Sequence, residues 1–426
     1  MKPSLRRGRG TAPQAHSPEV VDKHLHARLS SVLGYAKASV EALVGIDPAT
    51  GRDRAESRKV LSETAVLLLV AARADDGRHA DLIKELAVRI APHARSQAVR
   101  LAVAGAPSRA CWLGLAHVVL TKLGLPDAGF DQLLRYTLSG PVADACEREP
   151  HRVLDARWVR SLLDGGPVRY DDVASLSVLG RGLDLMTGAS EDAYALAHAL
   201  FYATDFGRLP LRLARSTESV LADVEGAVAI ALDADDLDLT AELLMAPAVL
   251  RVPWTPILTL AWHLLDAIWE EAEVVPSPDL DVAGYQAAEG RERDRIILRD
   301  TYHTMYAAGL LCATTLTSPH CPGAGPRTGP TGWESDDWAE RLRSEEDRAW
   351  LDTLARLEEK QRAGALPLVL DAAARRRALR GDLAGLADVL AEAVRSGNGS
   401  RHVIEQTAQF MDRLLTARDA AEAAPE

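Results

Sequence analysis

The residues best suited to chemistry lie in one apolar stretch, residues 194–207, which carries His198, Tyr202, Thr204 and Asp205. On a helix, His198 and Tyr202 share a face, and Asp205 follows near the same face. A carboxylate beside a histidine fixes its tautomer and raises its basicity, which is a common acid–base arrangement. The stretch therefore predicts His198 as general base or acid, Asp205 as the group that orients it and Tyr202 as a substrate contact. The structural alternative is a hydrogen-bonded core histidine with Asp205 and Thr204 capping a turn.

A second set of polar residues lies in the apolar segment 302–312, where Tyr302 and His303 are followed one turn later by Tyr306. Polar groups in a buried helix need hydrogen-bond partners or a chemical task, because burial without a partner is costly. If the buried helices surround one cavity, we expect His303 to act with His198 in catalysis and Tyr302 to contact the substrate.

An arginine stripe follows the first stretch, formed by Arg208, Arg212 and Arg215. A guanidinium group can bind a carboxylate or a phosphate through two hydrogen bonds. Arg208, the nearest of the three to the apolar stretch, is therefore predicted to bind substrate. A solvated helix face with acidic partners is the structural alternative.

No metal site is predicted, and no cofactor can be named. Three histidines, His198, His263 and His303, would suit zinc if they met, but they lie on distant segments without an HxxxH or HExxH pair. Walker, GxGxxG and GxSxG motifs are absent from the sequence. The four cysteines form no CxxC pair, which indicates reduced thiols and a cytoplasmic setting.

The run Asp233-Ala234-Asp235-Asp236 resembles the DxDD motif of class II terpene cyclases, whose middle Asp protonates an alkene or epoxide. Such cyclases use many aromatic residues to stabilise cations, whereas aromatic residues make up only 5% of this chain. Acidic residues before a helix commonly cap its first turn and interact with its dipole. We therefore interpret the run as a helix cap.

The elements that must position these residues are helices. The segments 108–123, 194–207, 254–270 and 302–312 are apolar on nearly every side, which is typical of buried helices. Amphipathic helices such as the one predicted over 20–44 lie between them, and alternating strand patterns are lacking. This arrangement predicts an all-α fold, as an α/α toroid or an irregular helical-hairpin array with a central cavity.

Four regions are predicted along the 426 residues. Residues 1–18 form a flexible basic tail, residues 19–317 the main helical domain, and residues 318–335 a loop rich in Pro and Gly. Residues 336–426 form a C-terminal helical segment that packs on the main domain. A loop as long as 318–335 is typical of a lid or a boundary.

Charge and hydropathy restrict the partners. The net charge is −12, so nucleic acid is disfavoured outside the basic tail, and no segment reaches the roughly 20 apolar residues of a membrane span. The expected partner is a small molecule or a peptide in the cavity, or a protein partner on the surface. The preference for Arg over Lys and the abundance of Ala favour a bacterial origin.

Parts of the chain resemble a bacterial family of helical proteins that is known only as a domain of unknown function. The resemblance lies in residues 198–207, in Tyr302-His303-Thr304 and in residues 309–312. It covers roughly the middle of the chain and implies a helical fold, but it supplies no activity and no catalytic residues. The prediction is thus a small-molecule or peptide-tailoring enzyme of biosynthesis, and the alternative is a non-catalytic helical scaffold that binds a peptide or protein on its concave surface.

Overall fold

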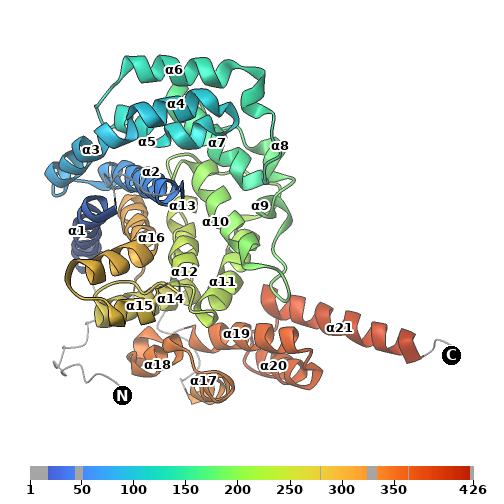
Figure 1. Ribbon diagram of the computed structural model, residues 1–426. Helices are drawn as coiled ribbons and strands as arrows, with labels where there is room; N and C mark the ends of the chain where they lie inside the picture. Colours follow the sequence, from blue (N-terminus) through green and yellow to red (C-terminus); the bar gives the residue numbers. More distant parts are fainter. Residues whose placement is uncertain (1–17, 44–50, 279, 324–332, 363, 423–426) are drawn as a thin grey trace.

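The computed structural model describes residues 18–43, 51–278, 280–323, 333–362 and 364–422. These residues form α-helices and short 3₁₀ turns without a β-strand (Figure 1), so the predicted all-α fold is confirmed. The predicted basic tail, apart from Pro18, lies outside the described residues, and so does the centre of the predicted loop 318–335.

Six helices form a closed ring in which each packs against the next and the last returns to the first (Figure 1). In ring order they are α2 (Gly51–Ala74), α5 (Ala110–Lys122), α7 (Pro150–Asp164), α10 (Ser190–Thr204), α12 (Leu237–Leu244) and α16 (Gly290–Thr317). The ring closes where α16 packs on α2, which precedes it by more than 200 residues. This closure brings distant polar residues into one interior.

The remaining helices of the main domain are not members of the ring. They are α1 (Pro18–Leu43), α3 (Ala80–Ala94), α4 (Gln97–Gly105), α6 (Ala128–Ser139), α8 (Asp171–Ala174), α9 (Val178–Arg181), α11 (Thr217–Asp233), α13 (Ala246–Leu250), α14 (Pro256–Ala272) and α15 (Val282–Ala287). Among them, α1 covers α16 and α2, and α11 and α14 cover α12. Inner and outer helices therefore alternate along the chain, but the number of outer helices between two inner ones varies.

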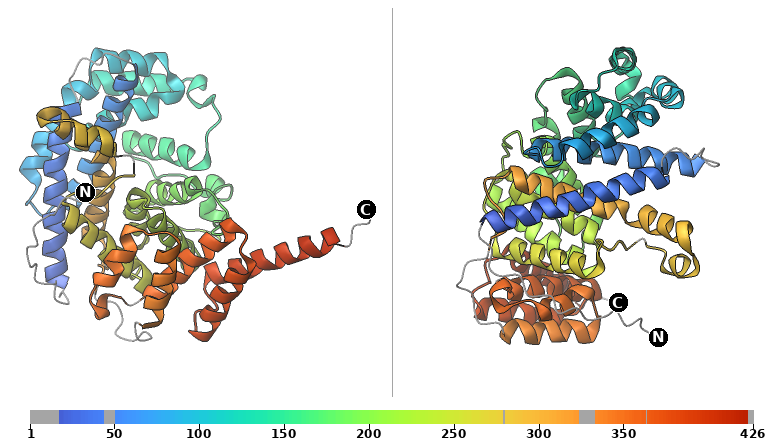
Figure 2. Two further views of the ribbon diagram at one scale, coloured as in Figure 1. Left: turned by 60° about the horizontal axis from the view of Figure 1, so that its bottom comes forward. Right: turned by 90° about the vertical axis from the view of Figure 1, so that its left-hand side faces the viewer.

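The C-terminal helices pack below the ring in the view of Figure 1. They are α17 (Trp333–Glu345), α18 (Ala349–Arg356), α19 (Ala365–Arg380), α20 (Leu383–Arg395) and α21 (His402–Glu422). α19 and α21 contact α11, and α18 and α19 contact α14. The end of α21 extends away from the body (Figure 2).

A glycine allows α16 to sit close to both α1 and α2. A Cβ atom at Gly309 would lie 2.5 Å from Cγ1 of Val32 and 3.0 Å from Cδ1 of Leu67, which is closer than side chains tolerate. The absence of a side chain therefore lets three helices pack together at this level. His303 lies six residues earlier on α16, where it contacts Glu63 of α2.

The four segments predicted as buried helices lie in α5, α10, α14 and α16, and most of their residues are buried. One of the outer helices, α11, begins at Thr217, after a segment that still carries apolar residues. Its start is set by Ser216, whose hydroxyl oxygen accepts a hydrogen bond from the backbone N–H of Ser219. Apolar periodicity cannot locate such a cap.

No single helix of the described chain is both long and apolar enough to cross a membrane. One pair of segments, Gln97–Gly105 with Pro107–Lys122, reaches that length only together, and it is bent by 113°.

Candidate active site

The six ring helices surround a cavity of about 950 Å³. Each ring helix contributes side chains to its wall. The lining also includes exposed residues, Glu149, Arg152, Glu191 and Asp192, so the cavity opens to solvent on their side.

The cavity wall is apolar in part and acidic in part. Its apolar residues include Val66, Trp112, Leu115, Phe201, Phe206 and Leu310. Its carboxylates are Glu63, Glu149, Asp155, Glu191, Asp192, Asp238 and Glu242, and only Lys59 and Arg152 are opposing permanent cations. This excess of carboxylates favours a ligand that carries positive charge and disfavours an anionic one.

His198, in the middle of α10, is paired with Glu242 of α12. Its Nε2 lies 3.3 Å from Oε1 and 3.2 Å from Oε2 of Glu242, with hydrogen-bond geometry to Oε1. Burial on its own lowers the pKa of His198, but the adjacent carboxylate outweighs it and raises the pKa above its ordinary value. The other ring nitrogen, Nδ1, is buried and has no hydrogen-bond partner. A histidine with one nitrogen held by a carboxylate and the other unused can transfer a proton.

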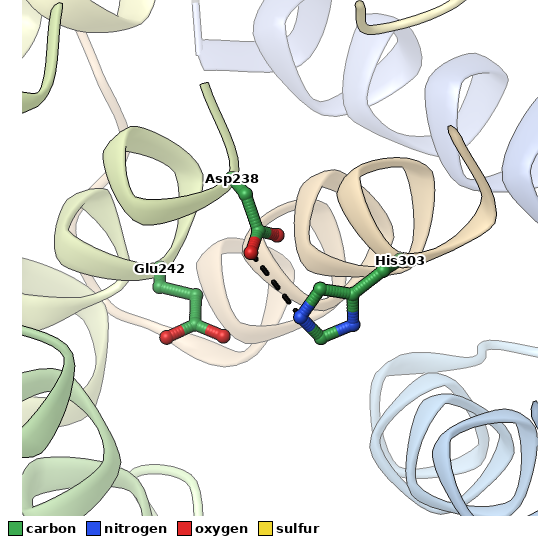
Figure 3. A group of neighbouring side chains, drawn as sticks. All are labelled: Asp238, Glu242 and His303. Atoms are coloured by element: carbon green, nitrogen blue, oxygen red, sulfur yellow. Dashed lines mark ion pairs between the residues drawn. The ribbon is translucent and has the colours of Figure 1, made fainter. Parts of the chain in front are cut away.

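His303, on α16, bridges two carboxylates. Its Nδ1 lies 3.0 Å from Oε2 of Glu63 on α2. Its Nε2 lies 3.2 Å from Oδ2 of Asp238 on α12 (Figure 3). Burial lowers the pKa of His303, whereas the two carboxylates together raise it well above its ordinary value. With both nitrogens engaged, His303 is held in place more firmly than His198.

A tyrosine connects the acidic residues at the start of α12. The hydroxyl of Tyr194 lies 3.1 Å from Oδ1 of Asp236 and 3.2 Å from Oδ2 of Asp238, and it can donate to either. Asp236 also caps α12 by accepting a hydrogen bond from the N–H of Leu239. Burial and the charge of Asp238 raise the pKa of Asp236 in spite of that hydrogen bond.

Two further titratable groups reach the cavity from α7, one turn apart. Burial and the nearby positive charge of Arg152 lower the pKa of His151 to about 4, so this ring is neutral at pH 7. Burial raises the pKa of Asp155 to about 6. The rings of His151 and His198 have centroids 5.8 Å apart.

The predicted pairing of Asp205 with His198 is wrong. Asp205 follows the end of α10 in a left-handed conformation, with φ of 48°, so it does not continue the helical face that carries His198. It accepts hydrogen bonds from Arg73, from Nε1 of Trp158 at 2.7 Å and from Arg208. Seven residues separate Asp205 from His198, which is about 10 Å along a helix. Asp205 therefore caps and anchors the helix end, as the structural alternative proposed.

Two of the predicted substrate contacts lie outside the cavity. Arg208 pairs with Asp205 at the helix end and is largely exposed, and Tyr302 is buried against His303 and Tyr306. Neither is among the residues that line the cavity, whereas Tyr202 is, with its ring against Trp158. Arg208 lies beyond the end of α10, whereas the turn of α16 directs Tyr302 to a different side from His303.

The buried histidines do not all converge. His117 is a core residue whose Nε2 lies 2.9 Å from Asp131 and whose Nδ1 accepts from Arg95 at 3.1 Å. His263 lies on α14, outside the ring, and is not a cavity residue. Only His198 and His303 of this set face the cavity, so the three-histidine zinc arrangement is not formed by the described residues.

The aspartates of the DxDD-like run are bound to protein partners. Asp233 pairs with Arg376, Asp235 with Arg348, and Asp236 caps α12. The interpretation of this run as a cap holds for Asp236, while Asp233 and Asp235 connect α11 to the C-terminal helices.

Sequence reasoning missed the carboxylates that complete the site: Glu63, Asp155, Asp238 and Glu242. A signal for two of them was present, because Asp238 and Glu242 are four residues apart and share a face of the short helix 237–244, whose residues are otherwise mostly apolar. Glu63 and Asp155 carry no comparable signal, since each lies on an ordinary amphipathic helix.

Comparison with known proteins gives one match. The model of a family described as a domain of unknown function, DUF6895, matches residues 30–313. That span includes every residue that lines the cavity and ends before the C-terminal helices. No curated protein and no solved structure matches the chain.

Proposed function

Because the chain belongs to the DUF6895 family, for which no activity is established, we propose its function from the cavity: an enzyme that transfers a proton to or from a bound small molecule or peptide. His198 is the proton-transferring group, and Glu242 takes the orienting role predicted for Asp205. The observation that carries the proposal is the state of His198, which is held at Nε2 and unpartnered at Nδ1 beside the cavity.

Other groups in the cavity support acid–base chemistry. Asp155, with a pKa of about 6, can exist in both protonation states near neutral pH and lies on the same cavity wall as His151. Titratable groups whose environments move their pKa values apart are typical of acid–base sites. In this proposal His303 holds the carboxylates in place, because both of its nitrogens are engaged.

The lining supports a ligand with an apolar body and a cationic or hydrogen-bond-donating group. Aromatic and aliphatic side chains would bury the body, and the carboxylates would bind the polar group. A biosynthetic intermediate or a peptide side chain with an amine fits this description. A role in the bacterial cytoplasm is part of the proposal and rests on residue composition and on the pattern of cysteines.

A second candidate is a non-catalytic helical scaffold that binds a peptide or protein partner. The observation that favours it is the internal pairing of His303 and Glu63, which leaves part of the polar cluster without a chemical task. The two candidates differ in whether the bound ligand is changed.

The test uses a matched pair of variants, His198→Asn and His24→Asn. His24 is also paired with a carboxylate, Asp266 at 2.8 Å, but it lies on α1 outside the cavity. The wild-type protein and both variants are incubated with small-molecule extracts enriched in amines, and the products are followed by mass spectrometry. We expect turnover by the wild type and by His24→Asn, and a loss of about 100-fold or more in His198→Asn.

Binding is measured in parallel by native mass spectrometry. If the wild type retains a cavity ligand but leaves it unchanged, and His198→Asn binds it equally well, the protein is a non-catalytic scaffold and the enzyme proposal is wrong. Equal turnover by His198→Asn and the wild type would remove His198 from the mechanism.

A further inference from the structure

We propose that Asp238, Glu242 and His303 bind one divalent transition-metal ion. The ligand set differs from the three-histidine set considered from the sequence, and it was not visible there because its members come from α12 and α16. The inference goes beyond the proposed function and does not depend on it, since a metal can be bound whether or not His198 transfers a proton.

The three side chains converge from two helices (Figure 3). One ligand atom from each lies within 4.8 Å of the others. Donor atoms at about 2.1 Å from a zinc-like ion are roughly 3–4 Å apart, so small side-chain rotations suffice to bring the three around one ion. Asp238 and Glu242 are one turn apart on α12, which presents both carboxylates on one face.

Two carboxylate oxygens at this site have no hydrogen bond. Oδ1 of Asp238 and Oε2 of Glu242 are buried and accept no hydrogen bond, although Oε2 lies 3.2 Å from the ring nitrogen Nε2 of His198. The two side chains are only 10% and 7% exposed. Buried carboxylate oxygens are normally hydrogen-bonded or bound to a cation, because burying an unpaired charge is costly. Both oxygens therefore point to a ligand that the protein itself does not supply.

The surrounding residues are arranged as supports for metal ligands. Glu63 faces Nδ1 of His303 and accepts its hydrogen bond, which places the Nδ1 proton on that side. A metal that displaces the proton between Nε2 and Asp238 can then bind the lone pair of Nε2. Tyr194 contacts Oδ2 of Asp238, and His198 is paired with Glu242. Each of the three ligands is thus held by a second residue, as ligands of metal sites generally are.

The donor set selects the class of ion. An imidazole nitrogen with two carboxylates suits Mn²⁺, Fe²⁺, Co²⁺ or Zn²⁺, whereas Mg²⁺ and Ca²⁺ prefer oxygen ligands alone. Two carboxylates balance the charge of a divalent ion. Three protein ligands leave at least one coordination position open toward the cavity, as in catalytic metal sites.

The experiment is a titration of the full-length protein, stripped with chelator, by Mn²⁺ and followed by electron paramagnetic resonance, in which free Mn²⁺ gives the signal. Mn²⁺ is chosen because it prefers oxygen and nitrogen ligands over the free thiols of this chain. We expect one Mn²⁺ per chain in the wild type and in the control His24→Asn. His303→Gln and Glu242→Gln are expected to lose affinity by more than 100-fold, and Glu63→Gln by about 10- to 100-fold.

The proposal is overturned if one equivalent of Mn²⁺ remains free with the wild type, or if both ligand variants bind as the wild type does. Circular dichroism checks that each variant is folded. Glu63→Gln, whose side chain is 24% exposed, decides the question if the ligand variants do not fold, and wild-type affinity in it would then overturn the proposal. The measurement contains no substrate, so its failure is separate from a failure of the His198 proposal.

Discussion

At the scale of single residues, the cavity contains a carboxyl group whose ionisation opposes folding. The pKa of Asp155 is raised to about 6 by burial, from an ordinary value of 3.8. The unfolded chain therefore ionises Asp155 more easily than the folded protein does. The resulting cost to stability is fully present above pH 6, decreases as the pH falls through 6 and is lost below about pH 4.

We predict that Asp155→Asn raises the free energy of unfolding at pH 7.5 by about 1–3 kcal/mol, and that the gain disappears at pH 4. Urea denaturation at both pH values measures it. Asp164→Asn is the control, because Asp164 is exposed at the end of the same helix, and its effect should stay within about 0.5 kcal/mol. A loss of stability in Asp155→Asn at both pH values would mean that this carboxylate is a structural acceptor.

Asp205 shows why a spacing argument can find the right stretch and assign the wrong role. The residue types that suit catalysis, a His and an Asp seven positions apart, also suit a helix that ends in a capped turn. The left-handed backbone at Asp205 decides between the two, and it directs the carboxylate to Arg73 and Trp158. No pattern in one sequence specifies that conformation for an Asp.

At the scale of elements, the position of α16 depends on the absence of a side chain at Gly309. We predict that Gly309→Ala destabilises the protein by about 1–3 kcal/mol, because the added methyl group meets Val32 and overpacks the contact with α1. Gly34→Ala, on α1, is the control of opposite sign. A Cβ there meets nothing within 4 Å, so the better helix propensity of Ala should stabilise by about 0.5–1 kcal/mol.

Thermal and urea unfolding of the two glycine variants provide the measurement. Stabilisation by Gly309→Ala would show that α16 can move away from α1 without loss. In that case the distance between His303 and Glu63 would not depend on this contact.

The helices themselves were largely predictable, because apolar periodicity identifies buried helices such as α5, α10, α14 and α16. Their arrangement was not. Whether an apolar helix lies in the ring, as α10 does, or outside it, as α14 does, depends on contacts between segments far apart in the chain. The same is true of the cavity wall. His198, Tyr202 and His303 could be proposed from the sequence and line the cavity, whereas Glu63 and Asp155 come close to them only because the ring closes.

At the scale of the whole molecule, a buried ion pair connects the ring domain to the C-terminal helices. Arg376 on α19 donates to both carboxylate oxygens of Asp233 at 2.7 and 2.6 Å, and both side chains are mostly buried. This contact joins Asp233, which lies within the family-matched span, to Arg376, which lies beyond it.

We predict that Arg376→Met lowers the free energy of unfolding by about 3–5 kcal/mol, because it leaves a buried Asp233 without its cation. Arg356→Met, which breaks the exposed pair with Glu271, should cost about 1 kcal/mol or less. Denaturant unfolding distinguishes the two. Equal effects would show that Asp233 is rescued by water or by Trp350, whose indole N–H donates to Oδ1 of Asp233 at 3.3 Å.

Closure of the helical ring also determines when the cavity comes into existence during synthesis. Glu63 and His303 are 240 residues apart, and α2 and α16 meet only after α16 has left the ribosome. At a synthesis rate of roughly 5–20 residues per second, the apolar face of α2 waits about 12–48 s for its partner. During that interval α2 can pack on α1, α3 and α5, but the surface that α16 will cover stays exposed, and chaperones bind surfaces of this kind.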